Sequence, residues 1–472
     1  MNEVVGFNHT SVVGKQMWLQ RSKLKLRTVV QAALLTCAVL IASSGPAMAQ
    51  AGKLDPTFGV GGISTDTAGQ LGTAVAMQSD GKIVAGGQIG SEAAVVRLNT
   101  NGTLDPTFGS GGTASISFSG DDFGGAQIIG LAIQTDGKIV AGISNFEQGF
   151  DPMFIVARLN VNGSLDTTFG SGGIVETQIG QFGAPDSVLA LQPDGRILIA
   201  GSGSMARYDT NGQMDITFGN DGVAPISFGS PTSIALQPDG KILLGSGGSV
   251  VAFAASTPGV TLNQVAGIIS RYNTNGSLDT SFGISGQAAS VVVAGAIAVE
   301  NDGICSSTCK ILAGGTLLTN LNSSNSSAGN AIGFGLARLN SNGSVDTTFG
   351  QGGAVSTSFG PNEAGATSFA LALQTNGEIV AAGSAGQLGN PTGLFVPQAG
   401  FALARYTSAG GLDTTFGSSG EVTTAFKTNQ AAIYGLALQS DGKIVAVGTS
   451  LQNSRNPGGQ TGGLVVARYL PK

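Results

Sequence analysis

Arginine and aspartate recur at one fixed separation along this chain. Arg97, for example, lies eight residues before Asp105, which belongs to a Leu-Asp-x-x-Phe-Gly sequence. A guanidinium and a carboxylate suit a bidentate, charge-assisted contact, and an Asn-Gly turn between the two residues would bring them together. Two solvated surface charges and a catalytic aspartate are the alternative interpretations. We expect a structural pair, because this segment keeps its length while the flanking loops vary.

The same arrangement recurs along the whole chain after residue 50. The pairs with this spacing are Arg97 and Asp105, Arg158 and Asp166, Arg207 and Asp215, Arg271 and Asp279, Arg338 and Asp346, and Arg405 and Asp413. Two further members stand alone, since Asp55 has no such arginine before it and Arg468 has no such aspartate after it. Seven equivalent aspartates favour an architectural role over a catalytic one.

Other reactive side chains are few. The only histidine, His9, and the only tryptophan, Trp18, lie in the first 49 residues. Without that segment, a Ser-His-Asp triad and a histidine-bound metal are excluded. Cys305 and Cys309, in Cys-Ser-Ser-Thr-Cys, predict a local disulfide in an oxidising compartment. A free redox or metal-binding pair is the alternative.

Acidic residues outside the repeated pairs offer one more kind of chemistry. Two carboxylates can serve as acid and base, as in glycosidases, and the candidates are Asp121, Asp122 and Glu363. Their loop positions favour ordinary solvated charges.

Strings such as residues 160–166, Asn-Val-Asn-Gly-Ser-Leu-Asp, faintly resemble calcium loops. Because each supplies one carboxylate where calcium prefers several, we expect turns and no cofactor, with calcium as the alternative.

The first 49 residues have the pattern of a signal peptide. Five basic residues precede an apolar run over Val29–Ala42, and Ala47-Met48-Ala49 follows. We predict cleavage after Ala49, which gives a secreted or periplasmic protein with no membrane span in the remainder. An uncleaved anchor helix and a lipoprotein modified at Cys37 are the alternatives.

Composition restricts the partners. The chain has 28 acidic against 22 basic residues, and loss of the basic leader makes the remainder more acidic. An acidic chain without basic runs argues against nucleic acid and anionic membrane surfaces as partners. The 76 glycines and the low share of charged residues, 11%, are typical of short strands joined by tight turns. We also expect the protein to be a monomer.

Three sequence elements repeat seven times and define the architecture. One is Leu-Asp-x-x-Phe-Gly, with 49 to 67 residues between successive aspartates; the second is Gln-x-Asp-Gly-Lys-Ile; the third holds the arginine. In the third copy we predict strands over 187–192, 196–201, 205–208 and 222–228, with a two-residue type I′ turn at Asp194-Gly195 and a second turn at Asn211-Gly212. We therefore predict an all-β fold over residues 50–472, a seven-bladed β-propeller of four-stranded antiparallel blades. A linear β-solenoid is the alternative.

These elements resemble the delta-60 repeat, a bacterial family whose repeats form β-propellers. The matching segments include Leu-Ala-Leu-Gln-Ser-Asp-Gly-Lys-Ile-Val-Ala at residues 436–446 and Leu-Asp-Thr-Thr-Phe-Gly at residues 165–170. The resemblance covers nearly all of residues 50–472, although the fifth and sixth Asp-Gly-Lys elements depart from it. It implies an exported, envelope-associated propeller and brings no catalytic residues, because the family has no common activity.

The unpaired charges at the two ends complement each other. We expect the segment from Leu54 to about Thr67 to complete the blade that ends at Leu470, pairing Asp55 with Arg468 and closing the ring. Insertions gather between the second and third strands of blades four to seven, chiefly in Ser246–Gly267, Thr316–Gly333 and Ser384–Gly400.

Loops on a rigid scaffold commonly carry binding sites. The sequence therefore favours an exported, non-catalytic scaffold that binds an unidentified protein or glycan through these loops. Tolerated drift of the loops is the neutral interpretation. An envelope hydrolase or lyase that uses carboxylates in the central channel is the alternative function, which an acidic cluster at the channel would favour.

Overall fold

The computed structural model describes most of the chain after residue 49. The described residues are 50–66, 71–118, 125–145, 153–179, 187–201, 203–227, 230–247, 267–300, 309–319, 330–359, 366–386, 400–426, 430–453 and 460–471. The chain divides into two units, Met1–Gln50 and Ala51–Lys472. The expected signal peptide lies outside the described residues. Within them, we find no helix with the length and hydropathy needed to cross a membrane.

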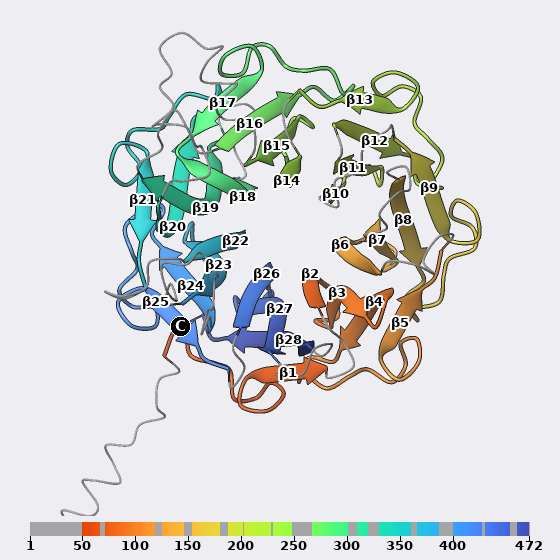
Figure 1. The fold of residues 1–472 in the computed structure, drawn as a ribbon, viewed down its shortest axis with the longest axis horizontal. Helices are drawn as coiled ribbons and strands as arrows, with labels where there is room; N and C mark the ends of the chain where they lie inside the picture. Colours follow the sequence, from red (N-terminus) through yellow and green to blue (C-terminus); the bar gives the residue numbers. More distant parts are fainter. Residues whose placement is uncertain are drawn as a thin grey trace, which may run out of the picture. The chain divides into compact units, whose positions relative to one another are not determined.

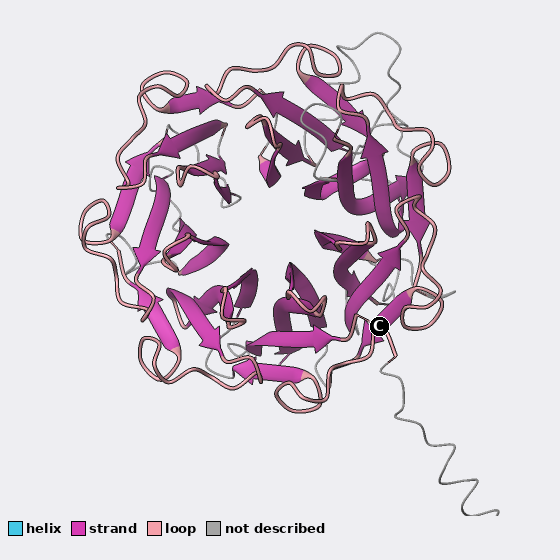
Figure 2. Ribbon diagram, turned by 180° about the vertical axis from the view of Figure 1, so that it is seen from behind, coloured by secondary structure: helices cyan, strands magenta, loops and turns pink. Residues whose placement is uncertain are grey.

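Ala51–Lys472 contains seven four-stranded antiparallel sheets, which confirms the predicted fold. The sheets stand as blades around a ring, and consecutive blades are neighbours (Figure 1). Seen from behind, the ring shows strands and loops, with no helix among the residues described (Figure 2). The solenoid alternative is therefore wrong.

Each blade has an inner, second, third and outer strand. The inner strands lie toward the ring centre in Figure 1 and are β2 (Leu71–Met77), β6 (Ala126–Ile133), β10 (Ser187–Leu191), β14 (Pro231–Leu236), β18 (Val292–Val299), β22 (Thr367–Leu373) and β26 (Gln430–Leu438). The second strands are β3 (Ile83–Ile89), β7 (Ile139–Asn145), β11 (Ile197–Gly201), β15 (Ile242–Ser246), β19 (Ile311–Thr319), β23 (Ile379–Ala385) and β27 (Ile444–Asn453).

The other two strands complete each blade toward the rim. The third strands are β4 (Glu92–Leu98), β8 (Met153–Leu159), β12 (Ser204–Tyr208), β16 (Gly267–Tyr272), β20 (Asn330–Leu339), β24 (Gly400–Tyr406) and β28 (Gln460–Tyr469). The outer strands are β5 (Thr113–Ile116), β9 (Ile174–Gln178), β13 (Val223–Pro225), β17 (Gln287–Ser290), β21 (Ala354–Thr357), β25 (Glu421–Thr424) and β1 (Ile63–Asp66).

The second and third strands form the core because neighbouring blades cover both of their faces. Val84 in β3, Val95 in β4 and Ile155 in β8 are each 0% exposed and belong to one hydrophobic cluster that spans blades one and two. Such strands read as continuous apolar runs, unlike strands with one solvated face. The sequence Ile-Val-Ala-Gly at the start of β3 and β7 follows this rule.

The Asp194-Gly195 turn differs from the predicted type I′ geometry. Gly195 donates its N–H to the Gln192 carbonyl at 2.9 Å, and Gln192 donates to the Arg196 carbonyl at 2.8 Å. Gly195 has a φ of +85°, whereas Asp194 is not among the residues with positive φ. A type I′ turn needs positive φ at both central residues, so this is a three-residue loop with a single left-handed glycine. Asn211-Gly212 forms the same loop, closed by the 2.8 Å bond from Asp209 N–H to the Gln213 carbonyl.

The N-terminal segment closes the ring as predicted. β1 pairs antiparallel with β28, and Ile63 stands opposite Ala467. Asp55 N–H donates to the Arg468 carbonyl at 2.8 Å, and Gly52 N–H donates to the Leu470 carbonyl at 2.8 Å. The last blade is therefore built from both ends of this unit.

The strand order also separates two faces. The loops after the inner strands and after the third strands lie on one face, which we name the turn face. The links from second to third strands and from blade to blade lie on the other, the connection face. Most of the three long insertions lies outside the described residues, at 248–266, 320–329 and 387–399.

Candidate functional site

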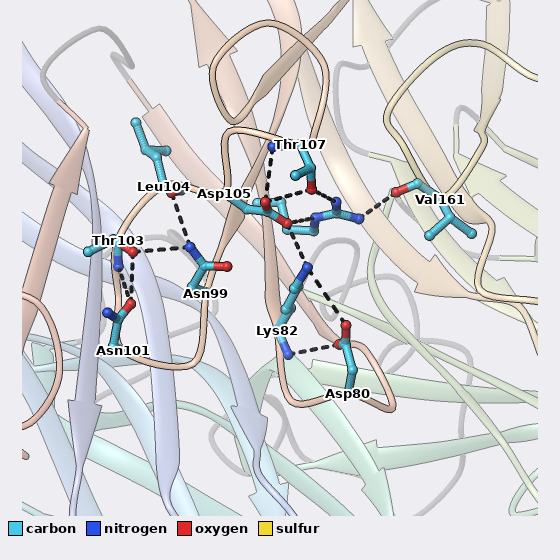
Figure 3. Close-up of polar contacts among 10 residues, drawn as sticks. Asp80, Lys82, Asn99, Asn101, Thr103, Leu104, Asp105, Thr107 and Val161 are labelled. Atoms are coloured by element: carbon cyan, nitrogen blue, oxygen red, sulfur yellow. Dashed lines mark hydrogen bonds and ion pairs between the residues drawn. The ribbon is translucent and has the colours of Figure 1, made fainter.

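The structure brings every arginine of the repeat to its aspartate. In blade one, Arg97 at the end of β4 donates its Nε–H to Asp105 Oδ2 at 2.8 Å (Figure 3). Oδ1 of the same carboxylate accepts the Thr107 N–H at 3.0 Å and the Thr107 hydroxyl at 2.7 Å. The expected fork-on-fork contact is therefore wrong, since the threonine occupies the second oxygen.

The same Nε-to-Oδ2 hydrogen bond is present in all seven blades. Its length lies between 2.7 and 2.9 Å for Arg97 and Asp105, Arg158 and Asp166, Arg207 and Asp215, Arg271 and Asp279, Arg338 and Asp346, Arg405 and Asp413, and Arg468 and Asp55. The seven arginines are buried, with exposed fractions from 3% to 8%. Solvated surface charges are excluded by this burial.

Burial and charge oppose each other at these carboxyls. Burial alone would raise the pKa of Asp105. Hydrogen bonds from Lys82 and Thr107, together with the charge of Arg97, outweigh burial and hold the pKa well below its ordinary value of 3.8. Asp166 has the same balance, with its pKa lowered by Lys138, Thr168 and Arg158. These carboxylates stay ionised, which suits a structural ion pair.

The phenylalanine of each Leu-Asp-x-x-Phe-Gly sequence has a role that the sequence analysis missed. Arg97 Cζ lies 4.6 Å from the centre of the Phe108 ring, and the other six arginines lie 4.5 to 4.7 Å from their phenylalanines. A guanidinium over a ring face gains a cation–π attraction. The constant spacing of arginine and phenylalanine, eleven residues in Arg97 and Phe108, was the available signal.

The guanidinium also reaches the next blade. Arg97 Nη1 donates to the carbonyl of Val161, in the turn after β8 (Figure 3). Gly109, which follows the phenylalanine, donates its N–H to the Asn162 carbonyl in the same turn at 2.8 Å. We name this set of arginine, aspartate, phenylalanine and next-blade carbonyl the interblade clasp.

Seven clasps run around the ring in one direction. The next-blade carbonyls belong to Val161, Thr210, Thr274, Ser341, Ser408, Pro471 and Thr100, in blade order from Arg97 to Arg468. The last bond, from Arg468 to Thr100, joins blade seven to blade one. The repeated charges therefore hold neighbouring blades together.

The Asp-Gly-Lys elements add a second cation in most blades. Lys82 Nζ lies 2.8 Å from Asp105 Oδ2, and Arg196 takes the equivalent place beside Asp215 at 2.9 Å. Blade six carries Glu378 instead, 3.4 Å from Arg405. In blade seven, Lys443 pairs with Asp441 of its own turn.

The remaining predicted site residues lie in different places. Asp121, Asp122, Glu363 and Cys305 fall outside the described residues. Cys309 is 2% exposed and disulfide-bonded, while its pairing with Cys305 stays a prediction. In the calcium-like string, both oxygens of Asp166 accept protein hydrogen bonds, from Arg158, Lys138 and Thr168. No group of three or more potential metal-ligating His, Cys, Asp or Glu residues is found in the part of the chain that the structure describes.

In five of the seven blades, the glutamine at the start of the turn element has a side-chain oxygen without a partner. Oε1 of Gln78, Gln134, Gln192, Gln237 and Gln374 is buried and accepts no hydrogen bond. Gln192 also borders a cavity of about 420 Å³ on the turn face, with Arg207 and Thr274 on its walls. Because the same oxygen recurs in five blades, we interpret it as a position for an ordered water.

The inner strands differ sharply from this charged turn face. All seven consist of uncharged residues, and none of them contains Asp, Glu, Lys, Arg, His or Cys. The carboxylates of the alternative enzyme hypothesis are therefore not on these strands.

Comparison with known families supports a β-propeller repeat protein. Six segments match a family model described as "Domain of unknown function (DUF5122) beta-propeller", namely residues 78–108, 134–169, 192–218, 237–282, 310–349 and 439–471. Together they cover less than half of the chain. No curated protein matches its sequence.

Several solved structures resemble the fold distantly. Virginiamycin B lyase from Staphylococcus aureus is 11% identical with a TM-score of 0.46, covering 86% of this chain and 99% of its own. The gluconolactonase XC5397 from Xanthomonas campestris is 11% identical with a TM-score of 0.32, covering 71% and 82%. Drosophila Semaphorin 1b, extracellular domains 1-2, is 10% identical with a TM-score of 0.38, covering 88% and 87%. Likenesses this distant carry no function to the chain.

Proposed function

We propose that this chain is an exported, non-catalytic β-propeller scaffold of the delta-60 repeat kind from a bacterium. It binds a protein or glycan through the long insertions of blades four to seven. The observation that carries this proposal is that the paired arginines and aspartates of the repeat are all engaged in structural ion pairs. Each Asp of the seven pairs is held in a clasp, and the inner strands are uncharged. A carboxylate that is ionised and saturated with donors is a poor general acid or base.

The place of the insertions supports the same proposal. The connection face carries the second-to-third-strand links, and the rigid ring of clasps lies at the opposite face. A rigid scaffold with variable loops on one face is a common design for recognition. In blade one the corresponding link is short, since β3 ends at Ile89 and β4 begins at Glu92. That short link provides a template for shortening the others.

The test removes these insertions and measures binding. Residues 248–266, 320–329 and 387–399 would each be replaced by the blade-one link, singly and together. Partners captured from cell-envelope extract would be identified by mass spectrometry and then titrated in purified form. We expect the triple variant to lose the identified partner while keeping its melting temperature. A matched control shortens the link at 146–152 in blade two and keeps binding.

Two results would overturn the proposal. One is equal binding of the identified partner by the triple variant and the parent protein. The other is steady turnover of a glycoside or ester substrate by the purified protein, since that would make it an enzyme.

A further inference from the structure

A β-bulge occurs at one register in six of the seven inner strands. The residue omitted from the pairing with the second strand is always five positions before the Gln or Glu of the turn element. The bulged residues are Thr73, Ile129, Thr232, Gly295, Phe369 and Tyr434. A bulge re-aims its side chain away from the regular alternation of the strand. This position is therefore a repeated one that each blade fills differently.

Two blades use the position for a contact with the next blade. The Thr73 hydroxyl donates to the Gly86 carbonyl at 3.2 Å and to the Ile128 carbonyl of the neighbouring inner strand β6. Thr232 makes the equivalent bonds to the carbonyls of Gly245 and Ala294. Threonine is thus compatible with this backbone, and its role here is structural.

Blades six and seven place aromatic rings at the same position. Phe369 in β22 and Tyr434 in β26 have ring centres 5.2 Å apart with planes tilted by 39°. Tyr434 is 42% exposed, although it lies on a strand at the centre of the ring. The other four tyrosines of the chain are at most 1% exposed. Among the exposed large hydrophobic residues that the structure describes, Tyr434 alone lies on an inner strand. An aromatic ring with an apolar face and a hydroxyl that is left open at such a place suits stacking against a ligand.

The surroundings specify an uncharged ligand with both donors and acceptors. The inner strands hold no charged side chain, so a charged ligand would lose its hydration without a counter-charge. Each inner strand is also the end strand of its sheet, with no neighbouring strand on its central edge. Such an edge presents alternating N–H donors and C=O acceptors. Hydroxyl groups, which both donate and accept, match this edge.

We propose that the Phe369–Tyr434 pair is a stacking platform for a neutral oligosaccharide at the centre of the ring. The aliphatic C–H face of a sugar lies against the exposed ring of Tyr434, which Phe369 of the neighbouring blade holds in place, and the sugar hydroxyls bond to the Tyr434 hydroxyl and to the edges of the inner strands. The proposed site is built from inner-strand residues alone and uses no residue of the insertions.

Tyr434 supplies a direct probe of the site. Tetranitromethane nitrates accessible tyrosines, and peptide mapping by mass spectrometry locates the product. We expect nitration at Tyr434, with the four buried tyrosines spared. Cellohexaose, maltohexaose and chitohexaose would be tested in turn, and at least one should slow this nitration. Oligogalacturonate, which is anionic, should give no protection.

Matched substitutions separate stacking from folding. Tyr434→Thr and Phe369→Thr install the residue that blades one and four use at this register, so both variants keep the bulge. We expect each to weaken calorimetric binding of the protecting hexasaccharide about tenfold, which corresponds to about 1.4 kcal/mol. Tyr434→Phe keeps the ring and should lose less. Ile129→Thr, at the same register in blade two, is the control and should bind as the parent does.

Either of two outcomes would overturn the platform. One is the absence of binding and protection with all three neutral hexasaccharides. The other is unchanged affinity in both threonine variants. The variant with all three insertions shortened should still bind the hexasaccharide. Its binding therefore distinguishes failure of this site from failure of the proposed loop surface.

Discussion

Removing Arg468 should destabilise the protein more than removing Arg97. Arg468→Met deletes the donor at 2.9 Å from Asp55 Oδ2, the bond to the Thr100 carbonyl of blade one and the cation over Phe58. Asp55 is 2% exposed, so its charge would stay buried.

The magnitude follows from the cations that remain. Asp105 keeps Lys82 at 2.8 Å when Arg97 is replaced. Asp55 keeps no such cation among its described contacts, because Lys443 pairs with Asp441. Breaking a buried pair costs about 3–5 kcal/mol when the remaining charge is uncompensated. Losing one hydrogen bond to a carboxylate that keeps another cation costs about 1.5–3 kcal/mol. We expect Arg468→Met to fall in the first range and Arg97→Met in the second.

Urea unfolding followed by circular dichroism would measure both variants, with calorimetry as a check. Arg405→Met is the matched control, because Asp413 also lacks a lysine, whereas Arg405 and Asp413 come from one continuous segment and not from the two ends of the propeller unit. It should resemble Arg468→Met if the missing cation dominates, and be milder if ring closure contributes. The reasoning fails if Arg97→Met proves as destabilising as Arg468→Met.

Three further predictions concern pH, the aromatic ring and the cysteines. The clasp carboxyls have folded pKa values below the ordinary 3.8. Their stabilisation is therefore complete above about pH 5 and is lost as the pH falls through the folded pKa. The melting temperature should hold steady from pH 7 to about 5 and drop steeply below about 4, and a fall between pH 7 and 5 would contradict this. Phe169→Ala removes a fully buried ring from beneath Arg158 and should cost about 3–5 kcal/mol in urea unfolding, whereas Val161→Ala, whose side chain is 49% exposed, should cost less than about 0.5 kcal/mol. Cys305→Ser should free one thiol for Ellman titration and cost about 2 kcal/mol, as expected for opening a five-residue loop; two free thiols in the parent protein would refute the disulfide.

The sequence predicts the ring well because its signals are local and repeated. The Asp-Gly and Asn-Gly elements mark hairpins, and the eight-residue spacing places Arg97 and Asp105 across one turn. The complementary ends, Asp55 and Arg468, predict the closure for the same reason. The type I′ assignment was wrong because a glycine after aspartate suits two kinds of loop. The carbonyl that Gln192 offers to Gly195 selects the other one.

The interblade contacts were harder to predict because they join residues far apart in sequence. Nothing in the sequence around Arg97 indicates that its Nη1 will donate a hydrogen bond to the Val161 carbonyl in the next blade. The pairing of Phe369 with Tyr434 was equally hard to predict from the sequence. Phe369 and Tyr434 look like ordinary apolar strand residues, and only the bulge register and the exposure of Tyr434 distinguish them.

The clasp also has a consequence for how such rings change over time. From the following blade, each clasp binds only main-chain carbonyls, such as those of Val161 and Asn162 for the clasp of Arg97, so its hydrogen bonds do not depend on that blade's side chains. Every boundary is chemically interchangeable, including the one between blades seven and one. A circular permutant with new ends in any blade-to-blade link should keep all seven clasps. Duplication or exchange of whole blades should likewise leave each junction intact, so the inner-strand residues are free to diverge one blade at a time.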